Sequence, residues 1–254
     1  MKILILSDQH FYNLADTRSD LFVSVLKKIR LEKLHPGVKE LWLMGDVFDM
    51  VIGNFSFWEK IHKEIFEEFR AWTRAGKKIV YLEGNHDFLI KDLMENLDIE
   101  VYENPTWYVL PQSQERVYLA HGDQVDDNNK AYIKWRQTIR GTAFRSVVRN
   151  CPEKIAHKVL LPIGEKLSHQ SRALNRLANL EAYKQMFREF AFKRMSEGAR
   201  AVFLGHSHVF DSYEQSEPAA TSSFYINLGS WLEPTKRYAI WDLTANKNAE
   251  VFNL

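Results

Sequence analysis

The sequence predicts an α/β protein in which two β-sheets pack face to face and helices cover their outer faces. Three observations predict this class. Five apolar runs of strand length each end in a short polar cluster, stretches of helical period separate the first three runs, and further strand-like runs follow the last cluster. A chain of 254 residues is long enough for one large domain, and we expect a single domain over residues 1–254.

The five apolar runs are the expected central strands. In chain order they are KILILS, KELWLM, KKIVYLE, RVYLA and ARAVFL. Arg18–Leu34 and Phe55–Arg74 have the apolar spacing of amphipathic helices, and we expect them to connect the first three strands. Near the carboxyl end, the runs SSFYINLGSW, RYAIWDL and AEVFNL are expected to be antiparallel strands that close the second sheet.

The alternation of strand and helix is interrupted between His121 and His206, which are 85 positions apart. Apolar residues recur there at helical spacing over residues 131–149 and 174–195, and Pro152, Pro162 and Gly164 separate the two stretches. We therefore predict that residues 127–197 form a helical cap that is inserted in the domain and lies over its functional site.

Charge is unevenly distributed, although the formal net charge of the chain is only +1. From Lys130 to Arg200 there are sixteen Lys and Arg residues and five Asp and Glu residues, a local excess of +11. This excess favours an anionic partner such as a phosphate, a nucleic acid or an acidic membrane surface. The simpler alternative is that these side chains only solvate helix faces.

Five polar clusters follow the five strands. They are Asp8-Gln9-His10, Gly45-Asp46, Gly84-Asn85-His86-Asp87, His121-Gly122-Asp123 and Gly205-His206-Ser207-His208. Because α/β sheets place their sites at the carboxyl ends of the strands, we expect the clusters to converge. Their carboxylate, imidazole and amide groups suit Mn, Fe, Zn or Co rather than a structural zinc site built on cysteine. Seven ligands are too many for one ion but suit two ions that share a bridging carboxylate.

The ordered motifs D-x-H, G-D, G-N-H-D, H-G-D and G-H-x-H resemble those of the calcineurin-like binuclear metallophosphoesterases over nearly the whole chain. The resemblance implies a four-layer α/β/β/α sandwich that binds two divalent metal ions. Its implied ligands are Asp8, His10 and His208 for the first metal, Asn85, His121 and His206 for the second, and Asp46 as the bridge between them.

The same resemblance implies a role for the histidine of G-N-H-D. His86 would contact the phosphate and protonate or stabilise the leaving oxygen, as a general acid does. A hydrogen bond from its imidazole to the neighbouring Asp87 is expected to orient the ring.

The residues around the motifs resemble one branch, the UDP-2,3-diacylglucosamine pyrophosphatases of lipid A biosynthesis, which also carry a helical lid after H-G-D. The similar segments are residues 45–49, 52–53, 85–90, 126–127 and 227–231, with Tyr132 and Arg136. The branch implies that water attacks the α-phosphate of a nucleotide-linked glycolipid. UMP and 2,3-diacylglucosamine 1-phosphate would be released, with Mn²⁺ as the usual metal.

Substrate contacts are expected from the cap and from the loops near the metals. Arg136, Arg140 and Arg145 are the predicted phosphate contacts, because they follow the H-G-D loop and arginine binds phosphate through a planar fork. Asn54 and Asp123 are further predicted contacts. The best-known members of the branch carry Arg at the position of His86, an acidic residue is expected at Asn54, and no cysteine follows Gln124.

Two alternative functions follow from other readings of the cap and the clusters. Another phosphodiesterase or a nuclease would present a continuous basic groove with exposed aromatic side chains for stacking. A protein-binding scaffold without catalysis is disfavoured by the complete ligand set. We expect no nucleic-acid partner.

The sequence also indicates where the enzyme works. No apolar stretch approaches the roughly 20 residues that span a bilayer. The chain enters a strand at Lys2 without a secretory signal, and its single cysteine, Cys151, fits a reducing compartment. We expect a cytoplasmic protein that makes peripheral contact with the cytoplasmic face of the inner membrane.

Overall fold

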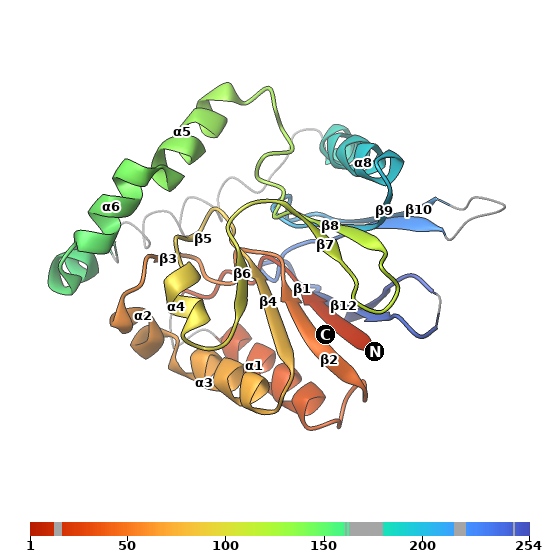
Figure 1. Ribbon diagram of the computed structural model, residues 1–254, viewed down its shortest axis with the longest axis horizontal. Coiled ribbons are helices and arrows are strands. Elements are labelled where there is room, and N and C mark those ends of the chain that lie inside the picture. The colour runs from red at the N-terminus through yellow and green to blue at the C-terminus, as the bar shows by residue number, and fades with distance from the viewer. Residues whose placement is uncertain (13–16, 161, 163–179, 216–221, 246) are drawn as a thin grey trace.

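The computed structural model describes residues 1–12, 17–160, 162, 180–215, 222–245 and 247–254. Its two main sheets lie face to face (Figure 1). The six-stranded sheet has the order β13 (Glu250–Asn253), β12 (Arg237–Asp242), β1 (Lys2–Leu6), β2 (Val38–Leu43), β4 (Lys78–Leu82) and β6 (Glu100–Tyr102). The five-stranded sheet has the order β10 (Phe210–Gln215), β11 (Ser223–Leu228), β9 (Ala199–Leu204), β8 (Arg116–Leu119) and β7 (Thr106–Val109).

Helices cover the outer face of each sheet. Helices α1 (Thr17–Arg30) and α3 (Lys63–Arg74) pack on the six-stranded sheet through residues such as Phe22 and Phe69. Helix α8 (Leu180–Ser196) packs on the five-stranded sheet through Phe187, Ala191 and Met195. The layers are therefore α/β/β/α, as the sequence predicts.

Alternate residues of the central strands face two different cores. In β1, Leu4 and Leu6 pack toward α1 and α3, whereas Ile3 and Ile5 pack between the sheets. Strands that are buried on both faces carry nearly continuous apolar runs. This is why the five predicted strands show no polar alternation and why all five are confirmed as β1, β2, β4, β8 and β9.

The prediction for the last three strands is partly wrong. Strand β11 does belong to the second sheet, but it pairs parallel to β9. Strands β12 and β13 belong to the first sheet, where β12 pairs antiparallel to β1. Tyr238 and Ile240 pack toward the helices, and Ala239 and Trp241 pack between the sheets. Strand β12 is therefore buried on both faces. Its apolar pattern therefore could not reveal which sheet it joins.

Two predicted helices are each divided into two. Phe55–Arg74 forms α2 (Ser56–Ile61) and α3, with the break at His62. In the insertion, α5 (Lys130–Arg140) and α6 (Thr142–Asn150) meet at Gly141, whose backbone is extended. The remaining short elements are β3 (Val51–Ile52), β5 (Asp87–Phe88) and α4 (Lys91–Glu95).

The described part of the insertion has two different environments. Helices α5 and α6 stand at the edge of the sandwich, beside β3 and β5 (Figure 1), and residues 153–160 are also helical. Helix α8, which the predicted cap of residues 127–197 includes, instead forms the outer layer of the second sheet. Residues 161 and 163–179 lie outside the described residues, so the boundary of the cap stays a prediction. Among the described residues, no helix is both long and apolar enough to cross a membrane.

Candidate metal centre

The five predicted clusters converge at the carboxyl ends of strands from both sheets. Strands β1, β2 and β4 are parallel neighbours in one sheet, and β8 and β9 are parallel neighbours in the other. Five residues in these turns have a positive φ of 52–64°, although none is glycine: Asp8, His10, Asp46, His206 and His208. Left-handed backbone at non-glycine residues is costly and gathers at functional sites, where the surrounding structure enforces it.

One group of ligand atoms comprises Asp8, His10, Asp46 and His208, and these atoms all lie within 4.8 Å of one another. The Nε2 atoms of His10 and His208 are 2.9 Å apart. Nε2 of His10 is 3.7 Å from Oδ2 of Asp46, and Nε2 of His208 is 3.5 Å from Oδ1 of Asp8. The residues predicted for the first metal are therefore brought together.

A second group comprises Asp46, His121 and His206, with the amide of Asn85 between the two imidazoles. Oδ1 of Asn85 is 2.8 Å from Nδ1 of His206 and 3.1 Å from Nε2 of His121. The same Nε2 of His121 is 3.2 Å from Oδ2 of Asp46. Asp46 thus belongs to both groups, which is the position expected of a bridging carboxylate.

Two glycines make room for the carboxylates. A Cβ atom on Gly84 would lie 2.0 Å from Oδ1 of Asp46, and a Cβ atom on Gly205 would lie 2.5 Å from Oδ2 of Asp8. Any side chain at either position would displace a carboxylate from the centre. The glycines of the G-N-H-D and G-H-x-H motifs are therefore required by this close approach.

Buried hydrogen bonds fix the turns from behind. The carboxylate of Asp87 accepts hydrogen bonds from the backbone N–H groups of Asp46, Val47 and Gly84, at 3.0, 2.7 and 2.8 Å. It thereby joins the G-D turn to the G-N-H-D turn. The predicted hydrogen bond between Asp87 and the imidazole of His86 is not formed, because this carboxylate already accepts from four backbone N–H groups, that of Phe48 included, and from the Tyr81 hydroxyl.

The segment after β11 braces the other two turns. Nδ2 of Asn227 donates to the backbone oxygen of Gly205 at 2.8 Å. The hydroxyl of Ser230 and the backbone N–H of Trp231 both donate to the backbone oxygen of Asp8, at 3.0 and 2.9 Å. The N-L-G-S-W segment therefore supports the loops that carry the ligands.

Asp49 is a site residue to which the sequence reasoning assigned no role. Its Oδ1 lies 3.2 Å from Nδ1 of His10, and its backbone oxygen lies 2.8 Å from Nδ1 of His86. A carboxylate on the far nitrogen of a ligand imidazole fixes the ring orientation and raises its basicity. The only signal in the sequence was its place three residues after Asp46, at the end of the same turn.

We expect Asp49→Asn to weaken metal binding by about 10–100-fold, the usual cost of losing such a supporting carboxylate. The variant keeps the size of the side chain and removes its charge. Titration with Mn²⁺ measures the affinity, and Asp98→Asn, on an exposed residue, is the matched control. Unchanged affinity in Asp49→Asn would contradict this role.

Burial and the neighbouring charges shift the pKa values of the residues in the centre in both directions. Burial raises the pKa of Asp8 to about 6, with a further contribution from Asp46. Burial disfavours the charged form of His121, but the carboxylates of Asp46 and Asp8 outweigh it and raise its pKa to about 10. Burial, together with repulsion from His121, lowers the pKa of His206 to about 4.

The donor set fits two divalent cations. In His10 and His121 the far Nδ1 donates to Asp49 and to the backbone oxygen of Met44, so the neutral rings present an acceptor Nε2 to the carboxylates and the amide oxygen. These acceptors cannot satisfy one another by hydrogen bonds alone. Cations placed among them satisfy several acceptors at once, and oxygen and nitrogen ligands suit Mn, Fe, Zn or Co.

The predicted substrate contacts on α5 are engaged with core carboxylates. Nε of Arg136 lies 2.6 Å from Oδ2 of Asp123, and Nη1 of Arg140 lies 2.6 Å from Oε2 of Glu83. On α6, Arg145 pairs with Glu103 at 2.7 Å but stays 41% exposed. The role of Arg136, Arg140 and Asp123 in phosphate binding stays a prediction, and each would have to give up its present partner to take it.

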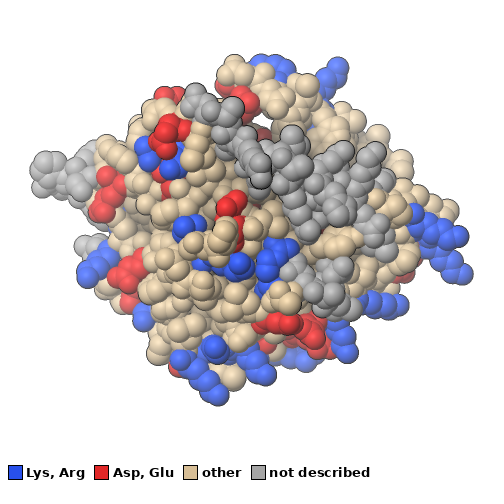
Figure 2. All heavy atoms as spheres, turned by 180° about the vertical axis from the view of Figure 1, so that it is seen from behind, with Lys and Arg blue, Asp and Glu red and all other residues tan. Residues whose placement is uncertain are grey.

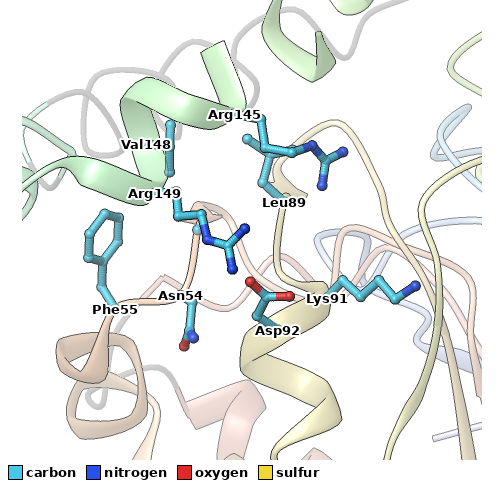
Figure 3. Close-up of a pocket in the computed structure, with 9 residues that line it drawn as sticks. Asn54, Phe55, Leu89, Lys91, Asp92, Arg145, Val148 and Arg149 are labelled. Atoms are coloured by element: carbon cyan, nitrogen blue, oxygen red, sulfur yellow. The ribbon is translucent and has the colours of Figure 1, made fainter. Parts of the chain in front are cut away.

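A cavity of about 260 Å³ lies between α6 and the loops after β3 and β5 (Figure 3). Phe55, Leu89 and Val148 form its apolar part. Its polar part comprises Asn54, Lys91, Asp92, Arg145 and Arg149. The predicted contacts Asn54 and Arg145 therefore line one cavity, and Leu89 is only three residues from His86.

The sequence model of the calcineurin-like phosphoesterase family matches residues 1–210 of this chain, a range that includes all five clusters. The chain belongs to the calcineurin-like phosphoesterase family. It is therefore an enzyme of phosphoester hydrolysis, and its divalent metals have a candidate site in the two ligand groups.

Relatives of this phosphoesterase include proteins named UDP-2,3-diacylglucosamine hydrolase. The one from Pseudomonas aeruginosa is 27% identical over 209 residues, covering 82% of each chain. The one from Aliivibrio fischeri is 24% identical over 214 residues, covering 84% of each chain. Among solved structures, TT1561 of Thermus thermophilus aligns over 99% of this chain and 98% of its own, with 13% identity and a TM-score of 0.42, too low to add to the argument.

Proposed function

We propose that this phosphoesterase hydrolyses UDP-2,3-diacylglucosamine to UMP and 2,3-diacylglucosamine 1-phosphate. The observation that carries the proposal is that relatives named for this substrate match the chain over most of both lengths. The buried ligand groups and the helices beside them supply what such a reaction requires, namely a charged centre next to an amphipathic wall.

We assign Asp8, His10 and His208 to a first metal, Asn85, His121 and His206 to a second, and Asp46 to both. Mn²⁺ is the metal we propose. Two divalent cations held by these residues would supply an electrostatic clamp for in-line displacement at phosphorus. The protein supplies the fixed turns, the bridging carboxylate and the supporting Asp49.

His86 is the proposed proton donor or stabiliser of the leaving oxygen. Its Nδ1 is committed to the backbone oxygen of Asp49 at 2.8 Å, which leaves Nε2 available for the phosphate. The ring also packs edge-on against His10, with centroids 4.9 Å apart, so its orientation is restrained.

The cavity beside α6 is the proposed site for the part of the substrate where the charged head adjoins an acyl chain. Asn54, Arg145 and Arg149 would meet polar groups of the head. Phe55, Leu89 and Val148 would contact apolar atoms. The close-up in Figure 3 draws both kinds of side chain around the same space, from two loops and one helix.

We also propose peripheral contact with an anionic membrane surface, through α6 and residues 153–160. Val147 and Ile155 are 67% and 53% exposed there, and basic residues such as Arg149 and Lys158 lie between such apolar residues. Exposed apolar side chains among lysines and arginines favour a lipid surface. On the face turned away in Figure 1, Lys and Arg also gather near the middle, with carboxylates beside them (Figure 2).

A substrate comparison tests the proposed function. The Mn²⁺-loaded enzyme would be assayed on UDP-2,3-diacylglucosamine, UDP-N-acetylglucosamine and bis(4-nitrophenyl) phosphate. Each buried methylene contributes about 0.8 kcal/mol, so even four of them correspond to roughly 100-fold in kcat/KM in favour of the diacyl substrate. Equal efficiency on all three compounds would instead support a general phosphodiesterase.

A further inference from the structure

Helix α5 presents three polar side chains to the loops that carry the second ligand group. Tyr132, Arg136 and Arg140 follow one another at intervals of four residues, so they lie along one face of the helix. Tyr132 and Arg136 contact the H-G-D loop, and Arg140 contacts the G-N-H-D loop.

Tyr132 and Arg136 hold the H-G-D loop. The Tyr132 hydroxyl and Nε of Arg136 both donate to Oδ2 of Asp123, at 2.9 and 2.6 Å. Asp123 is buried and follows His121 by two residues. The Tyr132 ring also lies 6.5 Å from the ring of His206, measured between centroids.

Arg140 holds the G-N-H-D loop. Its Nη1 donates to the carboxylate of Glu83 at 2.6 Å and to the backbone oxygen of Glu103 at 2.8 Å. Its Nη2 donates to the backbone oxygen of Gly84 at 2.6 Å. Gly84 immediately precedes Asn85, and Glu83 is only 2% exposed.

Apolar packing contributes little to the attachment of α5. Arg136 is the one residue of this helix that is buried, Ile139 is partly buried against the main core, and Trp135 is 48% exposed. The position of the helix therefore depends on the same polar contacts that restrain the two loops. Helix and loops hold one another in place.

We infer that the placement of α5 is coupled to the occupancy of the second ligand group, with Arg136 and Arg140 as positioning residues rather than contacts of the phosphate. The inference rests on the proposed metal assignment. A cation that fixes Asn85, His121 and His206 fixes the loops to which α5 is bound. By linkage, an ordered α5 raises the affinity for that cation by the same factor.

Hydrogen exchange with and without Mn²⁺ tests this coupling on the full chain. In the wild type, Mn²⁺ is expected to slow exchange of the α5 amides by about 5–150-fold, the usual range of such coupling. The variant Arg140→Lys keeps the charge but cannot form the forked bonds of a guanidinium. In it, protection of α5 by Mn²⁺ should be largely lost, and the second Mn²⁺ should bind about 10–100-fold more weakly while the first is retained.

Arg136→Lys is a second variant with the same expected result, and it replaces Arg140→Lys in these measurements if that variant does not fold. The matched control is Arg30→Lys, because Arg30 forms a forked pair with buried Glu68 between α1 and α3, away from α5. Metal affinity and α5 protection should be unchanged in it.

Identical α5 exchange in the metal-free and Mn²⁺-loaded wild type would overturn the inference. So would full affinity for two Mn²⁺ ions in both variants. Failure to hydrolyse UDP-2,3-diacylglucosamine would contradict the proposed substrate instead, and would leave the exchange and metal-binding results standing.

Discussion

Asp46→Asn is expected to abolish hydrolysis and to lower the metal content of the protein. Asp46 belongs to both ligand groups, and its carboxylate supplies negative charge that neutral His and Asn ligands cannot replace. Substitution of a residue that only supports a metal ligand typically lowers metal affinity or activity by about 10–100-fold. Loss of the bridging carboxylate should therefore lower activity by more than about 100-fold. Elemental analysis after gel filtration in Mn²⁺-free buffer gives the metal content.

The matched control for this substitution is Asp98→Asn, which makes the same chemical change on an exposed residue. Its activity and metal content should equal those of the wild type. An active Asp46→Asn enzyme with two metals per chain would show that Asp46 does not bridge.

His86→Ala is expected to lower kcat by about 10²–10⁴-fold, the usual contribution of a general acid, while both metals stay bound. The reason is that Nδ1 of His86 is occupied by the backbone of Asp49, and the ring lies beside the ligand groups rather than inside either proposed set of metal ligands. Rates on UDP-2,3-diacylglucosamine and Mn²⁺ stoichiometry are the two measurements.

A comparison of substrates with different leaving groups distinguishes a loss of proton donation from a general loss of structure in His86→Ala. A phenolate leaving group needs more help from an acid than a 4-nitrophenolate does, so the loss in His86→Ala should be much larger on a phenyl diester than on the matching nitrophenyl diester. His157→Ala, on an exposed histidine outside the centre, should retain full activity. Loss of a metal from His86→Ala, or an equal loss on both substrates, would contradict the acid role.

Much of the fold could be predicted because burial leaves a direct trace in the sequence. The five central strands are apolar on both faces, and their pairing as parallel neighbours places the following turns together. The polar clusters directly follow those strands, so the sequence predicts that Asp8, Asp46 and His121 meet. Local sequence is sufficient for this prediction because a strand end fixes the position of the few residues that follow it.

The supporting contacts could not be predicted in the same way. The sequence gives Asp49 no role and predicts the wrong partner, the imidazole of His86, for Asp87, because only the folded chain shows which donors each carboxylate meets. The partner of His86 is a backbone oxygen 37 positions earlier, which no side-chain pattern records.

The sequence by itself determined the chain order of the five central strands, the convergence of the five polar clusters that follow them and the basic charge of the helices between His121 and His206. The tertiary structure decided which sheet β12 joins and that α8 belongs to the outer layer. It also decided that the positive charges of Arg136 and Arg140 meet Asp123 and Glu83. The physical reason is the distance along the chain over which each pattern is set. Apolar periodicity and strand ends depend on neighbouring residues. The partner of a charged side chain is a residue distant in the chain, which only the fold brings close.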